Sequence, residues 1–159
     1  MGRLCVSVIG SSSATPQERA WAAEVGRLLA ENGIVLVCGG MGGVMEAACQ
    51  AAQSAGGITV GILPAPNRDA GNRFLDIAIP TGMGYARNAI VAYSGHAVIA
   101  IGGSSGTLSE IAYATIRDIP VVTLGSWGLE ERKLTHGARP MPATTPAEAV
   151  DKVLETVRR

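Results

Sequence analysis

The chain has 159 residues, of which 47% are hydrophobic and 16% are charged, and its formal net charge is zero. This length and composition predict a single domain over residues 1–159 with a sizeable core, and the balanced charge argues against nucleic acid as a partner. The longest apolar runs have only strand length and the N-terminus lacks the apolar region of a signal peptide, so we expect no membrane span and a cytoplasmic location.

Strand and helix patterns alternate along the first half of the chain. A helix should begin at Pro16, because proline is tolerated at the first helical position, and should end at Asn32 and Gly33. Residues 34–38 form a continuous apolar run, which is typical of a strand buried on both faces. The other predicted elements of this half are strands at 4–10, 58–64 and 75–81, a helix at 43–55 and a polar loop at 65–74.

The alternation continues through the second half. Thr107 and Glu110 have the T-x-x-E spacing of a capping box, which predicts a helix that begins at Thr107 and covers residues 107–118. Thr145 and Pro146 predict the start of a closing amphipathic helix. The other predicted elements are a helix at 82–95, strands at 97–101 and 120–125, and a loop at 126–143.

Strands that are joined through helices predict a parallel sheet. We therefore expect a Rossmann-like, doubly wound α/β fold with about six to seven strands and helices on both faces. In such folds the turns from strand to helix lie at the carboxyl edge of the sheet, where ligands bind. Three of these turns are built from glycine and hydroxyl residues: Gly10–Ser13, Gly39–Gly43 and Gly102–Thr107.

Each glycine turn that leads into a helix directs free backbone N–H groups toward one point, which suits an anion. One such turn is most often structural, but three at one edge favour a binding site for a small phosphorylated ligand, such as phosphate or a nucleoside monophosphate. The candidate ligand-binding residues are Gly10, Ser11, Ser12, Gly40, Gly42, Gly43, Gly103, Ser104, Ser105, Gly106 and Thr107.

Several common nucleotide and cofactor motifs are absent. Gly40 and Gly42 fit the start of G-x-G-x-x-G, but Met45 stands at its third glycine, and no lysine follows any glycine turn as a Walker A loop requires. Lysine occurs only at Lys133 and Lys152, which leaves no Schiff-base lysine near the turns. We therefore expect neither NAD nor pyridoxal phosphate, and no cofactor is required.

Cysteine and histidine give no sign of a metal site. Cys5, Cys38 and Cys49 fit neither a disulfide framework nor zinc spacing, so we interpret them as reduced core residues. His96 and His136 are far apart in the sequence. We expect no bound metal.

The segments "VSVIGSSS", "LVCGGMGGVMEAA" and "ARNAIVAYSGHAVIAIGGSSGTLSE" resemble the LOG family of cytokinin-activating phosphoribohydrolases, which are often labelled lysine decarboxylases. The run "GGMGGVMEAACQAA…GGITVGILP" is more similar to the short branch that includes molybdenum cofactor carrier proteins. The resemblance covers roughly residues 4–125. It places Arg87 and Glu110 on the family's arginine and glutamate, and Gly106 and Thr107 on its G-T pair.

The sequence departs from the family pattern at several of these positions. Gly102 and Ser104 stand where the family has proline and its second glycine, and Asn88 replaces the lysine after the arginine. In the first glycine motif, Cys38 and Glu46 replace the first and last glycines. The substrate therefore need not be that of the hydrolases.

The resemblance implies two functions. In the first, Glu110 stabilises an oxocarbenium-like state or activates water while Arg87 holds the ligand, so that a nucleoside 5′-monophosphate is hydrolysed to free base and ribose 5-phosphate. In the second, the same turns carry a phosphorylated pterin such as the molybdenum cofactor without turning it over. The alternatives to a functional role are a capping carboxylate for Glu110 and a solvated helix residue for Arg87. The resemblance also implies a homo-oligomer, either a dimer or a tetramer.

Overall fold

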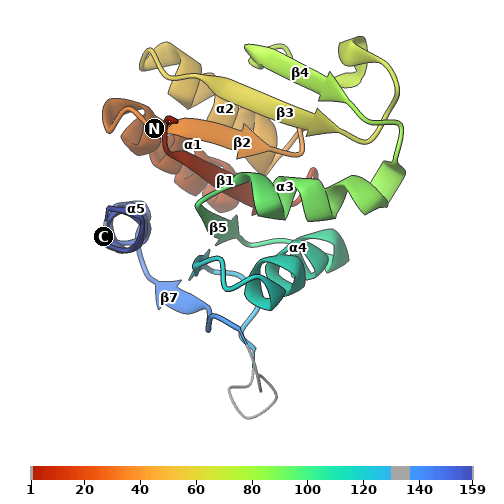
Figure 1. The fold of residues 1–159 in the computed structure, drawn as a ribbon. Coiled ribbons are helices and arrows are strands. Elements are labelled where there is room, and N and C mark those ends of the chain that lie inside the picture. Colours follow the sequence, from red (N-terminus) through yellow and green to blue (C-terminus); the bar gives the residue numbers. More distant parts are fainter. Residues whose placement is uncertain (1, 130–136, 159) are drawn as a thin grey trace.

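The computed structural model describes residues 2–129 and 137–158, and its centre is a sheet of seven parallel strands in the order β4-β3-β2-β1-β5-β6-β7 (Figure 1). The four strands from β1 to β4 come from the first half of the chain, and the other three from the second half. They are β1 (Cys5–Gly10), β2 (Val35–Cys38), β3 (Thr59–Leu63), β4 (Ile77–Pro80), β5 (Ala97–Ile101), β6 (Val121–Leu124) and β7 (Met141–Ala143).

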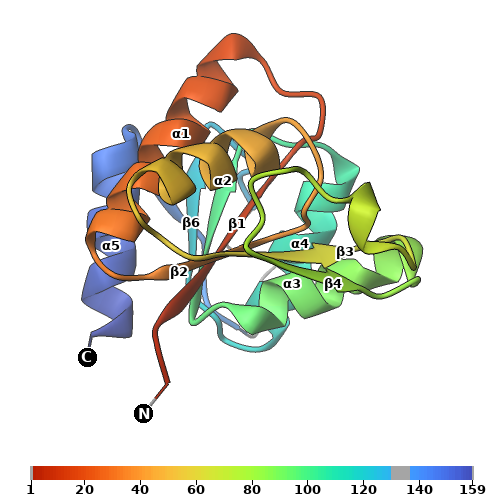
Figure 2. The ribbon, with the colours of Figure 1, turned by 90° about the horizontal axis from the view of Figure 1, so that it is seen from above.

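Helices cover both faces of this sheet, so the chain forms three layers. Figure 2 shows α1, α2 and α5 on one face and α3 and α4 on the other. The helices are α1 (Pro16–Glu31), α2 (Val44–Ser54), α3 (Asn88–Ser94), α4 (Ser105–Ile116) and α5 (Pro146–Val157), with short 3₁₀ helices η1 (Arg68–Ala70) and η2 (Gly84–Arg87). This arrangement confirms the predicted Rossmann-like α/β fold.

The order of the strands reverses direction between β1 and β5. From β1 the chain adds β2, β3 and β4 to one side, and it then returns to add β5, β6 and β7 to the other side. Gly10 at the end of β1 pairs in register with Ile101 at the end of β5. In open parallel sheets the crevice at such a switch point is the place where ligands bind, so the turns after these two strands are the first candidates for a site.

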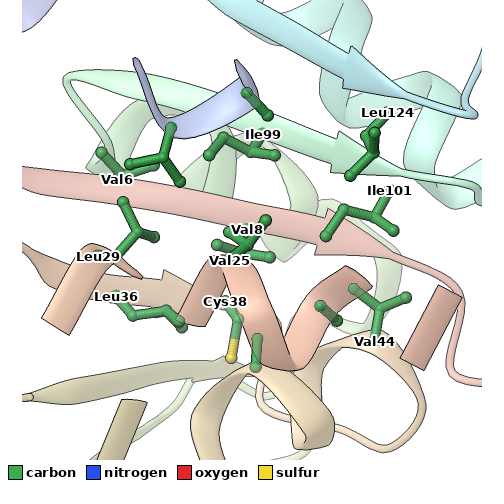
Figure 3. Close-up of a cluster of buried hydrophobic side chains, with 14 of the residues drawn as sticks. Val6, Val8, Val25, Leu29, Leu36, Cys38, Val44, Ile99, Ile101 and Leu124 are labelled. Atoms are coloured by element: carbon green, nitrogen blue, oxygen red, sulfur yellow. The ribbon is translucent and has the colours of Figure 1, made fainter. Parts of the chain in front are cut away.

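Two apolar clusters, one on each face, hold the helices against the sheet. Val8 and Ile101 belong to the cluster that packs against α1 and α2, which Figure 3 shows together with Val25 and Val44. Ile9 points to the opposite face, in the cluster with α3 and α4. Strands that are buried on both faces lose the alternation of polar and apolar residues, which explains the continuous apolar runs of the sequence.

The cysteines carry free thiols, as predicted, and two of the three belong to the core. Cys38 and Cys49 are fully buried, with their Sγ atoms 3.5 Å apart, whereas Cys5 is half-buried. Burial raises the pKa of the Cys5 thiol, and the hydrogen bond to Cys38 together with burial raises the pKa of the Cys49 thiol. Cys5 and Cys49 therefore prefer the neutral thiol form.

The predicted start of α4 is wrong by two residues, and so is its predicted capping box. α4 begins at Ser105 with Ser104 as its N-cap, so Thr107 and Glu110 lie inside the helix. The T-x-x-E capping box of this chain is instead Thr15 with Glu18, at the start of α1. There the Glu18 N–H donates to Thr15 Oγ1 over 3.1 Å, and the Thr15 N–H donates to the Glu18 carboxylate over 2.9 Å.

Two further element predictions need correction. The segment predicted as loop 126–143 contains the edge strand β7, which is only three residues long and carries proline in its middle. The predicted helix over 82–95 is divided into η2 and α3. Residues 130–136, which include Lys133 and His136, lie outside the described residues. Within the described part, no helix is long and apolar enough to cross a membrane.

Candidate functional site

A cavity of about 920 Å³ opens at the carboxyl edge of the sheet, next to the switch point between β1 and β5. This volume suits a ligand of the size of a nucleotide or a larger cofactor fragment. Its walls come from the turn after β1, the segments before and within α2, η2 and the first three turns of α4. The lining residues are Gly10, Ser11, Ser12, Met41, Met45, Pro64, Gly84, Tyr85, Ala86, Arg87, Asn88, Ser104, Ser105, Gly106, Thr107, Ser109, Glu110 and Tyr113.

The third glycine turn provides the polar end of this cavity. Gly102 begins the turn after β5, and Ser104 to Thr107 form the N-cap and first turn of α4. The first N–H groups of a helix have no partner within the helix, and the helix dipole adds positive potential there. Ser104 makes no side-chain capping bond, so neither its hydroxyl nor these N–H groups are engaged by a cap. The geometry suits an anion.

The first glycine turn lies across from α4. Gly10, Ser11 and Ser12 line the cavity, but the Ser11 hydroxyl already accepts the Ser13 N–H over 3.0 Å. The Ser11 carbonyl accepts the Val44 N–H over 3.0 Å, which joins this turn to the start of α2. These three residues were predicted as site residues, and they line the cavity together with Ser104, Ser105, Gly106 and Thr107.

The other four predicted glycines lie outside the cavity lining. Gly43 has a φ of 62° and contacts the Ser11 carbonyl so closely that a Cβ atom would overlap it, so it joins the first two turns. Gly40 packs against Leu63, and Gly42 faces the Ser12 carbonyl. Gly103 packs against the side chain of Thr107. In the structure these glycines shape the turns that carry the cavity-lining residues.

Arg87 closes the cavity from the η2 side and is only 8% exposed. Its Nε donates to the Ile62 carbonyl over 3.0 Å and its Nη2 to the Gly39 carbonyl over 3.4 Å, so it bridges the ends of β3 and β2. Burial lowers the pKa of Arg87, while Glu110 raises it. The arginine is therefore a fixed, buried cation, and the interpretation as a solvated helix residue is wrong.

Glu110 lies on α4, one helical turn beyond Thr107, and is 6% exposed. Burial raises the pKa of Glu110 to about 8, and the opposite charge of Arg87 lowers it. Within the described part of the chain, no hydrogen bond or ion pair joins this carboxyl to another side chain. At neutral pH the carboxyl is therefore mostly protonated, which is common for functional acids in clefts.

The cavity also has an apolar wall, which was not predicted from the sequence. It consists of Met41, Met45, Pro64, Tyr85 and Tyr113. Helical spacing could have found Tyr113, because it lies three residues after Glu110 and thus on the same helix face. Met41 lies within the second glycine turn and Met45 follows it, but nothing in the sequence alone tells which residues of this segment face a ligand.

Asn88 and Ser109 are two further cavity-lining residues that were not predicted as site residues. Asn88 is 3% exposed, and its Nδ2 donates to Ser109 Oγ over 3.0 Å. Glu46, in contrast, is not among the lining residues and pairs with Arg19 over 3.8 Å on the surface. No cluster of three or more metal-ligating side chains occurs among residues 2–129 and 137–158.

Two solved structures with this fold match nearly the whole chain. The molybdenum cofactor binding protein of Rippkaea orientalis is 37% identical, with a TM-score of 0.87 and coverage of 98% of both chains. The molybdenum cofactor carrier protein of Chlamydomonas reinhardtii is 32% identical, with a TM-score of 0.89, and the match covers 99% of this chain and all of the carrier.

More distant matches extend to other proteins. A cytokinin riboside 5′-monophosphate phosphoribohydrolase of Mycobacterium tuberculosis is 36% identical over 117 residues, which are 67% of this chain and 62% of that enzyme. DNA processing protein A of Helicobacter pylori has a TM-score of 0.69 at 21% identity, which shows a shared fold alone. The family model that describes the SLOG cluster4 family matches residues 3–152. The resemblance predicted from the glycine turns and from Arg87 and Glu110 is thus confirmed, and the chain belongs to the SLOG cluster4 family.

Proposed function

We propose that the chain binds a small phosphorylated molecule in the cavity and serves as its carrier. The observation that carries the proposal is the charge of the lining. Among the lining residues, Arg87 and Glu110 are the two with ionisable acidic or basic side chains. Because burial raises the pKa of Glu110 to about 8, this carboxyl is mostly neutral at pH 7. The cavity then has a net positive charge beside the α4 N-terminus, which favours an anionic group.

The rest of the cavity suits a flat ring attached to that anion. The wall of Met41, Met45 and Tyr113 offers apolar, polarisable surface of the kind that packs on a heteroaromatic ring. A phosphorylated pterin, such as the molybdenum cofactor, combines both parts. The full-length similarity to proteins that bind this cofactor supports a carrier over an enzyme.

Hydrolysis of a nucleoside 5′-monophosphate is the second candidate function, and Arg87 and Glu110 favour it because they face the same cavity. In this reaction the bond between C1′ and the base nitrogen breaks with its electron pair on the base, which takes a proton. A water oxygen then bonds to C1′ and loses a proton, so the products are free base and ribose 5-phosphate. A protonated Glu110 can supply the proton to the base, whereas an ionised Glu110 can stabilise the cationic sugar or activate water.

The two functions are separated by incubating the purified protein with AMP and other nucleoside monophosphates and measuring free base by chromatography. For a carrier we expect no release of base, and we expect pterin absorbance or fluorescence in protein purified from cells that make the molybdenum cofactor. Release of base by the wild type and its loss in Glu110→Gln would instead support the hydrolase. Glu46→Gln is the matched control, because Glu46 lies on the surface.

If base is released, the pH profile identifies the role of Glu110. A rate that falls as pH rises through about 8 indicates that protonated Glu110 donates to the base. A rate that rises through the same range indicates that the carboxylate acts on the sugar or on water. Neither pattern is expected of Glu110→Gln.

An assembly of identical chains fits the surface beside the cavity. Exposed apolar side chains cover β4, η2 and α3, and together we name them the β4–α3 patch: Ile77, Ile79, Met83, Tyr85, Ile90 and Tyr93. In the parallel register, Ile79 lies beside Ile62, which packs in the cluster under α3 and α4, so the patch is on that side of the sheet. A second copy of the chain would cover this surface and would extend the wall at Tyr85.

A further inference from the structure

A chain of hydrogen bonds runs from Arg87 to the first turn of α4. Arg87 Nη1 donates to Asn88 Oδ1, Asn88 Nδ2 donates to Ser109 Oγ over 3.0 Å, and Ser109 Oγ donates to the Gly106 carbonyl over 2.6 Å. All four residues line the cavity. The chain therefore connects the cavity's buried cation to the helix turn that offers its free N–H groups.

This network leaves the guanidinium ready for a ligand. Of its five N–H groups, one donates to Ile62, one to Gly39 and one to Asn88, so two remain for the cavity. Ordering a long side chain costs rotamer entropy, and here hydrogen bonds within the chain hold the Arg87 side chain, which lowers the cost of ordering it on binding. Asn88 links Arg87 to Ser109 without adding a charge, because its side-chain amide accepts a hydrogen bond from the arginine and donates one to the serine.

We propose that Asn88 and Ser109 are positioning residues, which hold the Arg87 guanidinium at a fixed place relative to the first turn of α4 so that both act on one anionic group. The inference rests on the proposed function for its ligand, but the hydrogen bonds that hold Arg87 come from the chain itself. The two parts are therefore tested by separate measurements.

The first measurement follows the Arg87 guanidinium by NMR in ¹⁵N-arginine-labelled protein, with its signals assigned from their loss in Arg87→Lys. In Asn88→Ala and Ser109→Ala we expect faster exchange of the Arg87 N–H groups with water than in the wild type. Ser94→Ala is the matched control, because the Ser94 hydroxyl also donates to a helix carbonyl, that of Ile90 over 2.6 Å, but lies outside the cavity lining. It should leave Arg87 unchanged.

The second measurement is the affinity for AMP and for inorganic phosphate by calorimetry. Loss of one positioning hydrogen bond should weaken binding about threefold to tenfold in Ser109→Ala. Ser109→Thr keeps the hydroxyl and should restore most of the affinity, which a purely structural effect of the substitution would not predict. Thermal melting of each variant identifies any loss of folding.

Two results would overturn the inference. In the first, Arg87 exchanges at the wild-type rate in both alanine variants, which shows that the network does not hold it. In the second, Arg87 loosens but the affinity for both probes stays the same, which shows that its position does not matter to the anion. If the wild type binds neither probe, the proposed function is wrong for these anions, and the exchange rates alone then decide whether Asn88 and Ser109 hold Arg87.

Discussion

Glu110 is a carboxyl group that folding moves out of water, and among residues 2–129 and 137–158 it has no direct ion pair. In the unfolded chain its pKa is near the ordinary value of 4.5, and burial raises it to about 8 in the folded state. Between these pH values the folded state binds more protons than the unfolded state. The free energy of unfolding should therefore fall as the pH rises from about 5 to 8, by up to about 1.4 kcal/mol for each pH unit.

Glu110→Gln should remove this dependence, because glutamine keeps the shape of the side chain and does not ionise. We expect the variant to be more stable than the wild type at pH 8 and close to it at pH 5, as measured by urea unfolding at the two pH values. Glu46→Gln, on the surface, should keep the wild-type slope. Equal pH slopes in the wild type and Glu110→Gln would show that Glu110 does not titrate in this range.

The sequence was sufficient to predict which charged residues meet in the cavity, but not which neutral residues support them. Arg87 and Glu110 are 23 positions apart, and the family resemblance rather than any local pattern brought them together. Asn88 and Ser109 belong to different helices, and their hydrogen bond depends on how α3 packs against α4. A contact of this kind has no periodic signal in the sequence.

At the level of the elements, two helix starts in this chain differ in how they are capped. α1 has the full capping box of Thr15 and Glu18, whereas Ser104 at α4 makes no side-chain capping bond. We expect Thr15→Ala to lower the free energy of unfolding by about 1 kcal/mol, and Ser104→Ala to change it by only a few tenths. Denaturant unfolding of both variants measures the difference.

The same pair of variants also distinguishes a structural from a binding role. Ser104 lines the cavity and Thr15 does not, so affinity for AMP or phosphate should fall in Ser104→Ala and stay at the wild-type level in Thr15→Ala. A large loss of stability in Ser104→Ala would mean that its hydroxyl caps α4 after all. In that case the open helix start would not be available to a ligand.

The element predictions succeeded where the apolar pattern was long and failed where it was short. Strands were predicted at the places of β1 to β6, and the continuous apolar run at 34–38 contains β2, whose four residues are all buried. β7 is an edge strand of three residues with Pro142 in its middle, and proline argues against a strand assignment. The start of α4 was wrong because T-x-x-E spacing occurs inside helices as well as at their ends.

At the scale of the whole molecule, the position of the cavity follows from the strand order. The reversal between β1 and β5 brings the first and third glycine turns to the same crevice, although about 90 residues separate them in the chain. Alternation of strands and helices predicts a parallel sheet, but many strand orders satisfy it. The strand order also depends on how the helices pack against the sheet, and the sequence pattern does not specify that packing.

The β4–α3 patch predicts that the chain self-associates in solution. In a two-fold dimer one substitution appears twice, so Ile90→Glu would place two carboxylates in the interface and should weaken association about tenfold or more. Sedimentation over a range of concentrations measures this, with melting curves to check folding. Gln17→Glu is the control, because Gln17 is an exposed residue of α1, which lies on the other face of the sheet from the patch, and the substitution adds the same charge there. A monomeric wild type would contradict the prediction, because it would show that no second chain covers the patch. An Ile90→Glu variant that associates like the wild type would also contradict it, because an interface that buries the patch cannot accept two charges without a free-energy cost.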